Sequence, residues 1–588
     1  MIYSRETHWK FLEQELAAQT EAFKQKLETS ATYLLQDKEE LFVAQFIKIE
    51  KGEMILRFST NRGIPRQGEY LYCFTVPKAL RNYREWGNMT YGDLIKSKHN
   101  YSEAICIWQM PSDEKEYCIV GFRGIDAEFA DDMKQAEGVV VLLGPNKPPY
   151  EYIANLQKIV QKTEHPNSDK ILDQNFELND TLPVPIDSKK NITDFLLSQL
   201  SLQDTAIIQG PPGTGKTHLI AEIVETLCKE SKTVLVTALT NRALIEIASK
   251  DALKLMLKEK RVLKTKISVD EAKILPDLES CKEITPQTGK VILSTFFIAS
   301  SAAVLSNSEP PFDYVIVDEA SQAVLGMVAA AKLLGEKIIL IGDVMQLPPV
   351  TAISNDIINR YDYHCLVDGL KSISGLELFP YYQLTETHRL CQRAANYTSK
   401  FYNTHITSKA KKIRSIKNDL PIDVGRYFHP EGGPTLIKTD LPIGELKPRN
   451  ALLIATELVA YLLKYDKKLN ISVLTYFVDT TKALQKTIYQ TVGYHKNLLI
   501  ETVSRVQGLT TDICIFVVPN SGYHRSLENR LFNVDTSRSR LNTIIIADKN
   551  VIKHSMADQF VLEYLKELDE EFSFSIIPEG SMLTIQNE

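Results

Sequence analysis

The period of the hydrophobic positions changes along the chain, and each change marks a different kind of structure. Across residues 8–35 apolar residues recur at helical spacing with Glu, Gln and Lys opposite them, which predicts an amphipathic helix. The apolar stripe is short, which favours an ordinary surface helix over a coiled-coil dimer. Across residues 41–143 short apolar strands follow one another, and the Gly/Pro-rich residues 144–149 end the pattern. A succession of short strands is typical of a small β-barrel.

Beyond residue 149 near-continuous apolar strands alternate with helical segments. Strands of this kind, separated by helices, predict parallel sheets that are covered on both faces. The expected strands lie at residues 206–208, 233–237, 291–295, 314–317 and 337–341, and then at 471–475, 497–501, 513–518 and 543–547. We therefore predict an α/β fold in which two such halves follow the barrel.

A glycine-rich turn separates the first of these strands from the helix that follows it. It matches the phosphate-binding loop pattern G-x-x-x-x-G-K-[ST] through Gly210, Pro211, Pro212, Gly213, Thr214, Gly215, Lys216 and Thr217. The glycines let backbone N–H groups approach phosphate oxygens, and the helix adds its positive dipole end. Lys216 is expected to reach the β- and γ-phosphates of ATP, and the Thr217 hydroxyl to bind Mg²⁺. Strand, loop and helix in this order favour nucleotide binding over a glycine-rich turn with a chance lysine.

Two later strands end in polar residues that suit ATP hydrolysis. Asp318 follows the strand at 314–317 and is expected to hold Mg²⁺, while Glu319 deprotonates the attacking water. An acidic pair that caps the next helix is the alternative interpretation. Gln346 follows the strand at 337–341 and is placed to sense the γ-phosphate by a hydrogen bond, although alone this segment would be taken for a turn. One phosphate loop for two α/β halves predicts that ATP binds in the cleft between them.

Composition limits the other classes of function. The 588 residues suffice for roughly three or four domains, and 44% hydrophobic residues support folded cores. The net charge of −6 does not indicate a nucleic-acid binder as a whole, so any such site must be local. Eight scattered cysteines without a C-x-x-C pair argue against a disulfide framework or a zinc site and fit a reducing cytosol. The polar N-terminus and the absence of a long apolar run predict a cytoplasmic protein with no membrane contact.

The order of the motifs adds a family resemblance. Gly-Pro-Pro-Gly-Thr-Gly-Lys-Thr, then Asp-Glu-Ala-Ser-Gln, then Gly-Asp-x-x-Gln-Leu-Pro-Pro resembles the superfamily 1 helicases. The chain is similar to their 5′→3′ branch, which includes the nonsense-mediated-decay RNA helicase and the immunoglobulin-mu-binding-protein helicase. The resemblance implies two tandem RecA-like domains preceded by a helical stalk and a small β-barrel. On this chain it implies a stalk at 1–40, a barrel accessory domain at 41–148, a first RecA-like domain with the phosphate loop at 149–351 and a second at 352–588.

The resemblance also implies contacts with a nucleic-acid strand. In the family, Thr and Asn positions of one motif and a Ser-Thr pair of the next touch the backbone of the strand. The stiff Pro-Pro element after Gln346 would pass the state of the nucleotide to the same groove. The residues that match these positions are Thr240, Asn241, Ser294, Thr295 and Pro349.

Further motifs imply contacts with the nucleotide. Arg389 matches the arginine that the family brings to the γ-phosphate. Residues 533–540 resemble the last family motif, whose first arginine is the arginine finger, so Arg538 is the first candidate and Arg540 the second. A planar guanidinium suits the charge that develops on the transferred phosphoryl group. Two more nucleotide contacts are implied, an aromatic against the base and a glycine near the ribose: Phe477 and Gly508.

The sequence departs from the family pattern in several places. Asn191-Ile192-Thr193 stands where the family has a Gln that reads adenine, so base selectivity is left open. Thr510 replaces the acid of Gln-Gly-x-Glu, which weakens or removes a ribose contact. The segment between Asn241 and Val291 is short, so the extra subdomain of the nonsense-decay helicase is expected to be absent. Basic clusters at 250–266 and 409–417 either contact phosphates or form solvated surface.

These expectations combine into an ATP-dependent helicase or translocase on single-stranded nucleic acid, RNA or DNA, that steps 5′→3′ and unwinds duplexes. It would act as a monomeric motor whose barrel or stalk binds protein partners. Two alternatives stay open. An ATP-gated clamp or sensor would bind the strand without unwinding it. A protein-remodelling ring ATPase would take its arginines from a neighbouring subunit, whereas Arg389 and Arg538 belong to the same chain as the phosphate loop.

Overall fold

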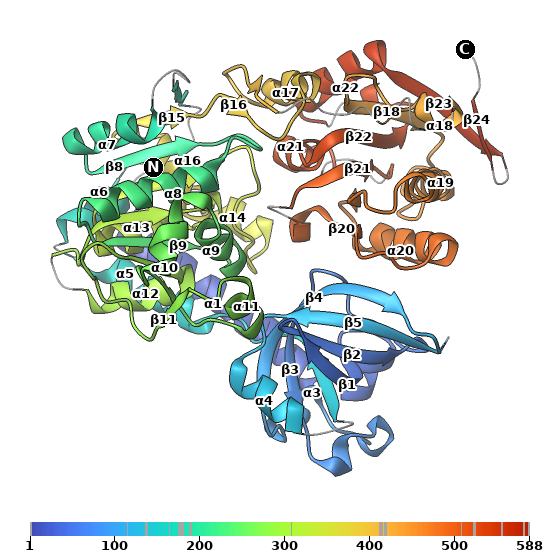
Figure 1. Ribbon diagram of the computed structural model, residues 1–588, viewed down its shortest axis with the longest axis horizontal. Helices are drawn as coiled ribbons and strands as arrows, with labels where there is room; N and C mark the ends of the chain where they lie inside the picture. The colour runs from blue at the N-terminus through green and yellow to red at the C-terminus, as the bar shows by residue number, and fades with distance from the viewer. Residues whose placement is uncertain are drawn as a thin grey trace.

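The computed structural model shows a β-barrel and two α/β units (Figure 1). The barrel is blue and lies at the bottom of the view, the first α/β unit is mostly green, and the second is orange and red. None of the helices in the described parts of the chain is long and apolar enough to cross a bilayer. The structure describes residues 3–114, 116–135, 139–163, 165–174, 181–186, 191–306, 309–410, 416, 420, 422–506, 509–520, 525–553, 557–579 and 582–585.

The N-terminal helical segment is split in two. α1 (Arg5–Glu28) begins after Ser4, whose side chain caps its first turn, and ends at Thr29, where the backbone is extended. α2 (Ala31–Gln36) follows directly. The single helix expected over residues 8–35 is therefore interrupted, because an extended residue cannot continue the helical hydrogen-bond pattern.

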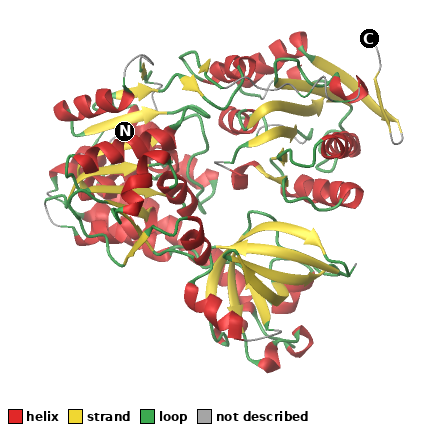
Figure 2. Ribbon diagram, viewed as in Figure 1, coloured by secondary structure: helices red, strands yellow, loops and turns green. Residues whose placement is uncertain are grey.

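Six antiparallel strands close into a barrel in the order β1, β2, β5, β4, β3 and β6. Figure 2 draws the strands of the barrel in yellow. They are β1 (Phe42–Glu50), β2 (Glu53–Ser59), β3 (Tyr70–Thr75), β4 (Tyr101–Pro111), β5 (Tyr117–Arg123) and β6 (Val140–Gly144). Phe58 and Phe122 lie fully buried in its core. Gly121 has no side chain because a Cβ there would lie 2.2 Å from Trp108 Cε2. The predicted small β-barrel is confirmed.

The first α/β unit is built on nine parallel strands in the order β11, β10, β12, β9, β13, β14, β8, β15 and β7. They are β7 (Val184–Pro185), β8 (Thr205–Gln209), β9 (Val234–Ala238), β10 (Val262–Thr265), β11 (Glu279–Cys281), β12 (Val291–Thr295), β13 (Phe312–Val317), β14 (Gly335–Gly342) and β15 (Tyr381–Gln383). The central strands are buried on both faces, so their apolar runs do not alternate.

Helices cover both faces of this sheet. One face packs against α5 (Tyr150–Gln161), α6 (Pro166–Leu172), α12 (Phe296–Leu305), α13 (Leu325–Leu334) and α16 (Gly369–Ser374). The other packs against α7 (Ile192–Leu202), α8 (Lys216–Lys229) and α9 (Asn241–Ala248). The doubly covered parallel sheet expected from the continuous apolar strands is present.

The first unit extends past the boundary expected between residues 351 and 352. β15 pairs with β8 in parallel, and α16 packs against α13 of the same unit. The Tyr381 hydroxyl donates a hydrogen bond to the Gln209 side chain at the end of β8. The chain leaves this sheet only after Leu384, because the open edge of β8 takes β15 as its neighbour.

The second α/β unit has seven strands in the order β20, β19, β21, β22, β18, β23 and β24. They are β18 (Gly433–Thr439), β19 (Ile471–Thr475), β20 (Leu498–Thr502), β21 (Thr511–Val517), β22 (Ser539–Asp548), β23 (Ser573–Glu579) and β24 (Met582–Ile585). β24 alone among these pairs antiparallel. The faces are covered by α19 (Arg449–Tyr465) and α20 (Val478–Val492), and by α17 (Gln392–Thr398), α21 (Asn529–Thr536) and α22 (Gln559–Glu571).

The barrel is attached to both α/β units. Asp270 at the start of α11 (Val269–Ile274) accepts a hydrogen bond from the Gly124 N–H of the barrel at 3.0 Å. On the other side, Lys496 Nζ of the second unit lies 4.3 Å from the centroid of the Trp108 ring. The first contact is a hydrogen bond to the backbone of the barrel, and the second is a cation–π contact from an exposed lysine.

α1 fixes the segment that follows the Gln346 loop. Glu15 is only 3% exposed, and its carboxylate accepts hydrogen bonds from the Ala352 N–H at 2.8 Å and the Ile353 N–H at 3.1 Å. Gln19 donates to the same carboxylate at 2.7 Å. The N-terminal helix is therefore part of the frame of the first unit.

Replacing Glu15 with alanine leaves these backbone N–H groups without their acceptor, which costs about 1–3 kcal/mol. We expect the Glu15→Ala variant to melt at a lower temperature in differential scanning fluorimetry. Glu13→Ala, at an exposed position of the same helix, is the control and should melt like the wild type. Equal melting of both variants would contradict this role of Glu15.

Candidate active site

The phosphate loop connects the carboxyl end of β8 to the start of α8 and is shaped by its glycines. Gly213 and Gly215 have φ values of 76° and 82°, a left-handed conformation that favours glycine. A Cβ at Gly210 would lie 2.4 Å from Lys216 Cγ, so the lysine side chain folds closely over the loop. Its Nζ donates a hydrogen bond to the Gly210 carbonyl. Backbone groups and one ammonium thus form a cradle of the kind that binds phosphates.

The acidic residues lie at the ends of the strands beside this loop. Asp318 follows β13 and Asp343 follows β14, and β14 pairs with β8. Burial raises the pKa of Asp318 to about 6. Burial, and then the charge of Asp318, raise the pKa of Glu319 to about 7, which suits a general base near neutral pH. Burial lowers the pKa of Lys216, and the two aspartates oppose this shift.

The backbone of Glu319 is strained. Its φ is 51°, a left-handed conformation that side chains rarely adopt, and it stands at the start of a short turn of 3₁₀ helix, η4 (Ala320–Gln322). The Glu319 N–H donates to Asp318 Oδ1 at 2.9 Å. Strained backbone of this kind concentrates at functional sites. The alternative that the acidic pair only caps a helix is not favoured, because Glu319 at the N-cap of η4 makes no capping hydrogen bond with its side chain.

The residues at this edge fit a magnesium ion. No group of three or more His, Cys, Asp or Glu side chains that could hold a metal alone occurs among the described residues. Mg²⁺ that accompanies a nucleotide needs fewer protein ligands, because phosphate oxygens and waters complete its shell. Thr217, in the first turn of α8, and the buried Asp318 are the residues that would hold it.

The chain that leads into the second unit passes directly over the phosphate loop. The His388 N–H donates to the Gly213 carbonyl at 2.8 Å, and the Thr387 hydroxyl donates to the Pro212 carbonyl at 2.9 Å. Arg389 follows, with its Nη1 3.5 Å from the Ser537 carbonyl. Burial, reinforced by the charge of Arg538, lowers the pKa of Arg389 to about 10. Arg389 therefore lies at the phosphate loop, and its contact with a γ-phosphate stays a prediction.

The two candidate arginine fingers have different surroundings. Arg538 follows α21, is 4% exposed, and donates from Nη1 to the Leu509 carbonyl at 3.3 Å. Arg540 is exposed and pairs with Asp512 at 3.8 Å. Arg538 is buried and, after burial itself, does most to lower the pKa of Arg389, whereas the exposed Arg540 does less, so the structure favours the first candidate.

The other predicted sites are placed unevenly. Thr240 and Asn241 are exposed at the start of α9, where the Thr240 hydroxyl caps the helix, and Pro349 is half-buried. Ser294 is fully buried in β12, with its hydroxyl 3.0 Å from the Thr265 hydroxyl, and Thr295 is 7% exposed. Ser294 thus lies inside the sheet, with β10 and β9 on either side of its strand. Its side chain is not presented to a nucleic-acid strand.

The residues at the positions expected to contact the base and the ribose have different surroundings. Phe477 is half-buried at the start of α20 and packs against Tyr476, with ring centroids 5.1 Å apart. Gly508 lies outside the described residues. Asn191 caps α7, where its side chain accepts from the Thr193 N–H at 3.1 Å and the Asp194 N–H. The side-chain oxygen of Asn191 caps the helix. This role agrees with the absence of the family's adenine-reading Gln from this segment.

The basic clusters are largely neutralised where they are described. In the 250–266 cluster, ion pairs with neighbouring acids are formed by Lys250, Lys254, Lys260, Arg261 and Lys264. Lys264 is fully buried with Glu271. In the second cluster Lys409 pairs with Glu386 at 3.3 Å, and residues 411–415 and 417–419 lie outside the described residues. The pairing favours solvated surface over phosphate contacts for the first cluster.

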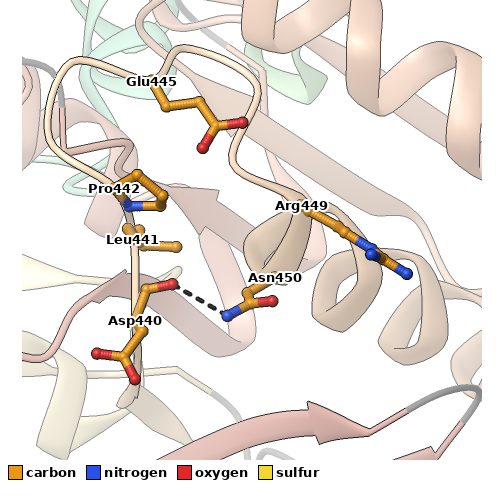
Figure 3. Close-up of a pocket in the computed structure, with 6 residues that line it drawn as sticks. All are labelled: Asp440, Leu441, Pro442, Glu445, Arg449 and Asn450. Atoms are coloured by element: carbon orange, nitrogen blue, oxygen red, sulfur yellow. Dashed lines mark hydrogen bonds between the residues drawn. The ribbon is translucent and has the colours of Figure 1, made fainter.

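A surface pocket in the second unit contains none of the predicted site residues. Figure 3 shows it between the end of β18 and the start of α19, where Asn450 Nδ2 donates to the Asp440 carbonyl at 3.0 Å. The cavity measures about 370 Å³ and is lined by Asp440, Leu441, Pro442, Glu445, Arg449 and Asn450. Acidic and basic side chains face it together, so no single ligand charge is favoured.

Sequence reasoning missed three polar residues beside the predicted site. Tyr402 and Asn533 of the second unit form hydrogen bonds with the loop after β14, and Thr387 contacts the phosphate loop. Gln346 lies in that loop and donates to Asp343 Oδ2 at 3.1 Å. No local sequence pattern indicates a role for Tyr402, because its hydrogen-bond partner Asp343 lies 59 residues earlier in the chain.

Comparison with known proteins places the chain among helicase relatives. Residues 196–352 match the AAA domain family model. The DNA replication ATP-dependent helicase/nuclease DNA2 of Saccharomyces cerevisiae is 34% identical over 158 residues, which are 26% of this chain and 10% of that protein. DNA-binding protein SMUBP-2 of Mesocricetus auratus is 24% identical over 471 residues, with 67% and 46% covered. An uncharacterized ATP-dependent helicase of Methanocaldococcus jannaschii is 23% identical over 345 residues, with 54% and 49% covered.

The chain spans less than half the length of each of these relatives. Among solved structures, the crystal structure of Arterivirus nonstructural protein 10 (helicase) matches 86% of this chain and 76% of that chain at 11% identity, with a TM-score of 0.37. Residues 196–352 thus match an AAA domain, and the chain is a homologue of ATP-dependent helicases.

Gly213 tests the fit of the two units at the loop. A Cβ there would lie 2.4 Å from Arg389 Cβ and 2.7 Å from Thr387 Oγ1, and the residue has positive φ. We expect Gly213→Ala to weaken binding of a fluorescent ATP analogue and to lower ATP hydrolysis. The control is Gly326→Ala in α13, where a Cβ meets only ordinary contacts at 3.6 Å or more. Wild-type nucleotide affinity in Gly213→Ala would contradict this geometry.

Proposed function

We propose that the protein is an ATP-driven motor that steps 5′→3′ along single-stranded nucleic acid and unwinds duplexes. The observation that carries the proposal is that Arg389 of the second unit packs against Gly213 of the loop that holds Lys216 and reaches the Ser537 carbonyl, next to Arg538. Each buried positive charge disfavours the charged form of its neighbour. The negative charge of a polyphosphate bound between the units would offset this repulsion. The homology with ATP-dependent helicases supports the same conclusion.

In the proposed reaction, the loop N–H groups and Lys216 bind the β- and γ-phosphates. Glu319 accepts a proton from the water that attacks the γ-phosphorus, and the bond to the β–γ bridging oxygen breaks to give ADP and phosphate. Arg389 and Arg538 stabilise the charge on the transferred phosphoryl group. Gln346 contacts the γ-phosphate and reports its presence. Mg²⁺, when bound at Thr217 and Asp318, neutralises part of the phosphate charge.

We assign the mechanical roles to the parts of the fold. The first RecA-like domain would run from residue 149 to the end of β15, and the second from there to residue 588. The stalk at 1–40 and the barrel at 41–148 would guide the strand or bind protein partners. A cavity of about 620 Å³ lies between α1, the barrel and the second unit, where Arg66 and Arg505 line it. Glu40 and Glu69 line the same cavity, so its charge is mixed.

The strand would also pass the exposed Thr240 and Asn241 and the half-buried Pro349. The names of the relatives refer to DNA, so single-stranded DNA is the first substrate to test and RNA the second. All eight cysteines are free and seven are buried, which supports a reducing, cytoplasmic environment. Because both arginines belong to the same chain as the loop, we propose a monomeric motor over a ring ATPase.

We expect ATP hydrolysis to rise when single-stranded DNA or RNA is added to the purified protein. Glu319→Gln keeps the shape of the side chain but removes the base, and should lower the stimulated rate by about 10²–10⁴-fold. ATPase assays with each strand type, followed by strand displacement from a labelled duplex, provide the measurement. A rate indifferent to both strands would overturn the motor. Stimulation without displacement would establish the ATP-gated clamp instead.

Substitutions of the two arginines of the last motif are expected to lower kcat by different amounts. Arg538→Lys keeps the charge but loses the planar guanidinium, and removal of an arginine finger costs about 10³-fold or more in kcat. Arg540→Lys changes an exposed ion pair and should leave kcat within about twofold. Steady-state ATPase of both variants with saturating strand decides between them. A large loss in Arg540→Lys and none in Arg538→Lys would reverse the assignment.

A further inference from the structure

A buried tyrosine joins the two α/β units beside the candidate active site. Tyr402 follows the short 3₁₀ helix η5 (Ser399–Phe401) of the second unit and is 7% exposed. Its hydroxyl donates to Asp343 Oδ2 of the first unit at 2.8 Å. The same hydroxyl accepts a hydrogen bond from Asn533 Nδ2 at 2.9 Å. One hydroxyl therefore links a loop of the first unit to α21 of the second.

Asp343 is the partner that connects this link to the nucleotide loop. It is 1% exposed and accepts hydrogen bonds from the Met345 N–H at 3.0 Å and from Gln346 Nε2 at 3.1 Å. Its charge also raises the pKa of Lys216 against the effect of burial. The carboxylate is thus close to the phosphate-binding lysine while it holds the side chain of Gln346.

Gln346 and Tyr402 donate to the same oxygen, Asp343 Oδ2. Two donors on one carboxylate oxygen share its charge, so removing one strengthens the bond to the other. If Gln346 turns towards a γ-phosphate, Tyr402 becomes the main donor to Oδ2. The link between the units then tightens when ATP is present and relaxes when the γ-phosphate has left.

Asn533 carries the link to the arginine finger. It lies on α21 and also donates to the Met345 carbonyl of the first unit at 2.9 Å. Arg538 follows the end of this helix, and the Ser537 carbonyl accepts from Arg389. A rigid helix that is fixed at Asn533 therefore also fixes the starting point of the Arg538 side chain.

We propose that Tyr402 is a positioning residue that couples Gln346 in the first unit to α21 and Arg538 in the second. The inference rests on the proposed function and adds the route by which the γ-phosphate would control closure of the units. The Tyr402 hydroxyl is hydrogen-bonded to Asp343 and Asn533, and neither residue belongs to the phosphate loop or to the proposed magnesium ligands. Its effect is on the rate of hydrolysis, and the affinity for ADP, which lacks the γ-phosphate, is unchanged.

Tyr402→Phe removes only the hydroxyl and is the test. We expect kcat for ATP to fall about tenfold, the effect of losing a hydrogen bond to a charged group, while the affinity for a fluorescent ADP analogue stays at the wild-type value. Rates are normalised to the number of nucleotide sites titrated, so that loss of folded protein is not counted as loss of kcat. The comparison is made without a strand and with single-stranded DNA.

Tyr397→Phe is the matched control. Its hydroxyl also donates to a carboxylate, that of Glu571, but both residues belong to the second unit. We expect its kcat to match the wild type. Equal kcat in the two variants, or a parallel loss of ADP affinity in Tyr402→Phe, would overturn the proposal.

A double-mutant cycle with Gln346→Ala tests the shared oxygen. If the two residues act independently, the fold losses in kcat of the single variants multiply in the double variant. Coupling through Asp343 predicts that the loss in the double variant differs from this product. The cycle is measured on ATP hydrolysis alone. If a strand does not stimulate the wild type, the proposed motor fails, yet the cycle still decides whether Tyr402 couples the units.

Discussion

The structure depends on one contact between the two α/β units, where the chain passes from the first to the second over the phosphate loop. The His388 N–H binds the Gly213 carbonyl, and Arg389 packs where any side chain at Gly213 would stand. The loop thus offers its inner face to phosphate and its outer face to the second unit. A change in the conformation of the loop therefore acts directly on the segment that carries Arg389.

The rest of the fold forms a frame around this contact. β13, β14 and β8 end at one edge of the nine-stranded sheet and bring Asp318, Asp343 and the loop together. Glu15 of α1 holds the chain just after the Gln346 loop, and α11 holds the barrel. The polar groups by which the second unit meets this frame include the buried Tyr402 and Asn533, and Arg530, which pairs with Asp368 at 2.6 Å. Such an arrangement allows hinge motion at the contact between the units without disturbing the frame.

Much of the fold and the site was predictable because local patterns specify it. The phosphate loop and Asp318 follow buried strands, and the barrel strands form a regular succession. β18 was missed because Pro434 lies inside it, and a proline argues against a central strand. The end of the first unit was placed too early because β15 joins the edge of β8 from a distance in sequence. Ser294 matched a motif, yet its burial depends on Thr265 of a neighbouring strand.

The central claim is that one chain supplies both the phosphate loop and the arginine that acts on its nucleotide. Mixing Lys216→Ala with Arg538→Ala tests it most directly, since each inactive variant retains the residue that the other lacks. Our account predicts no recovery of ATP hydrolysis in the mixture at any concentration, with a wild-type rate per chain that does not depend on dilution. Recovery of activity on mixing would show that the arginine acts on a neighbouring subunit and would contradict the account.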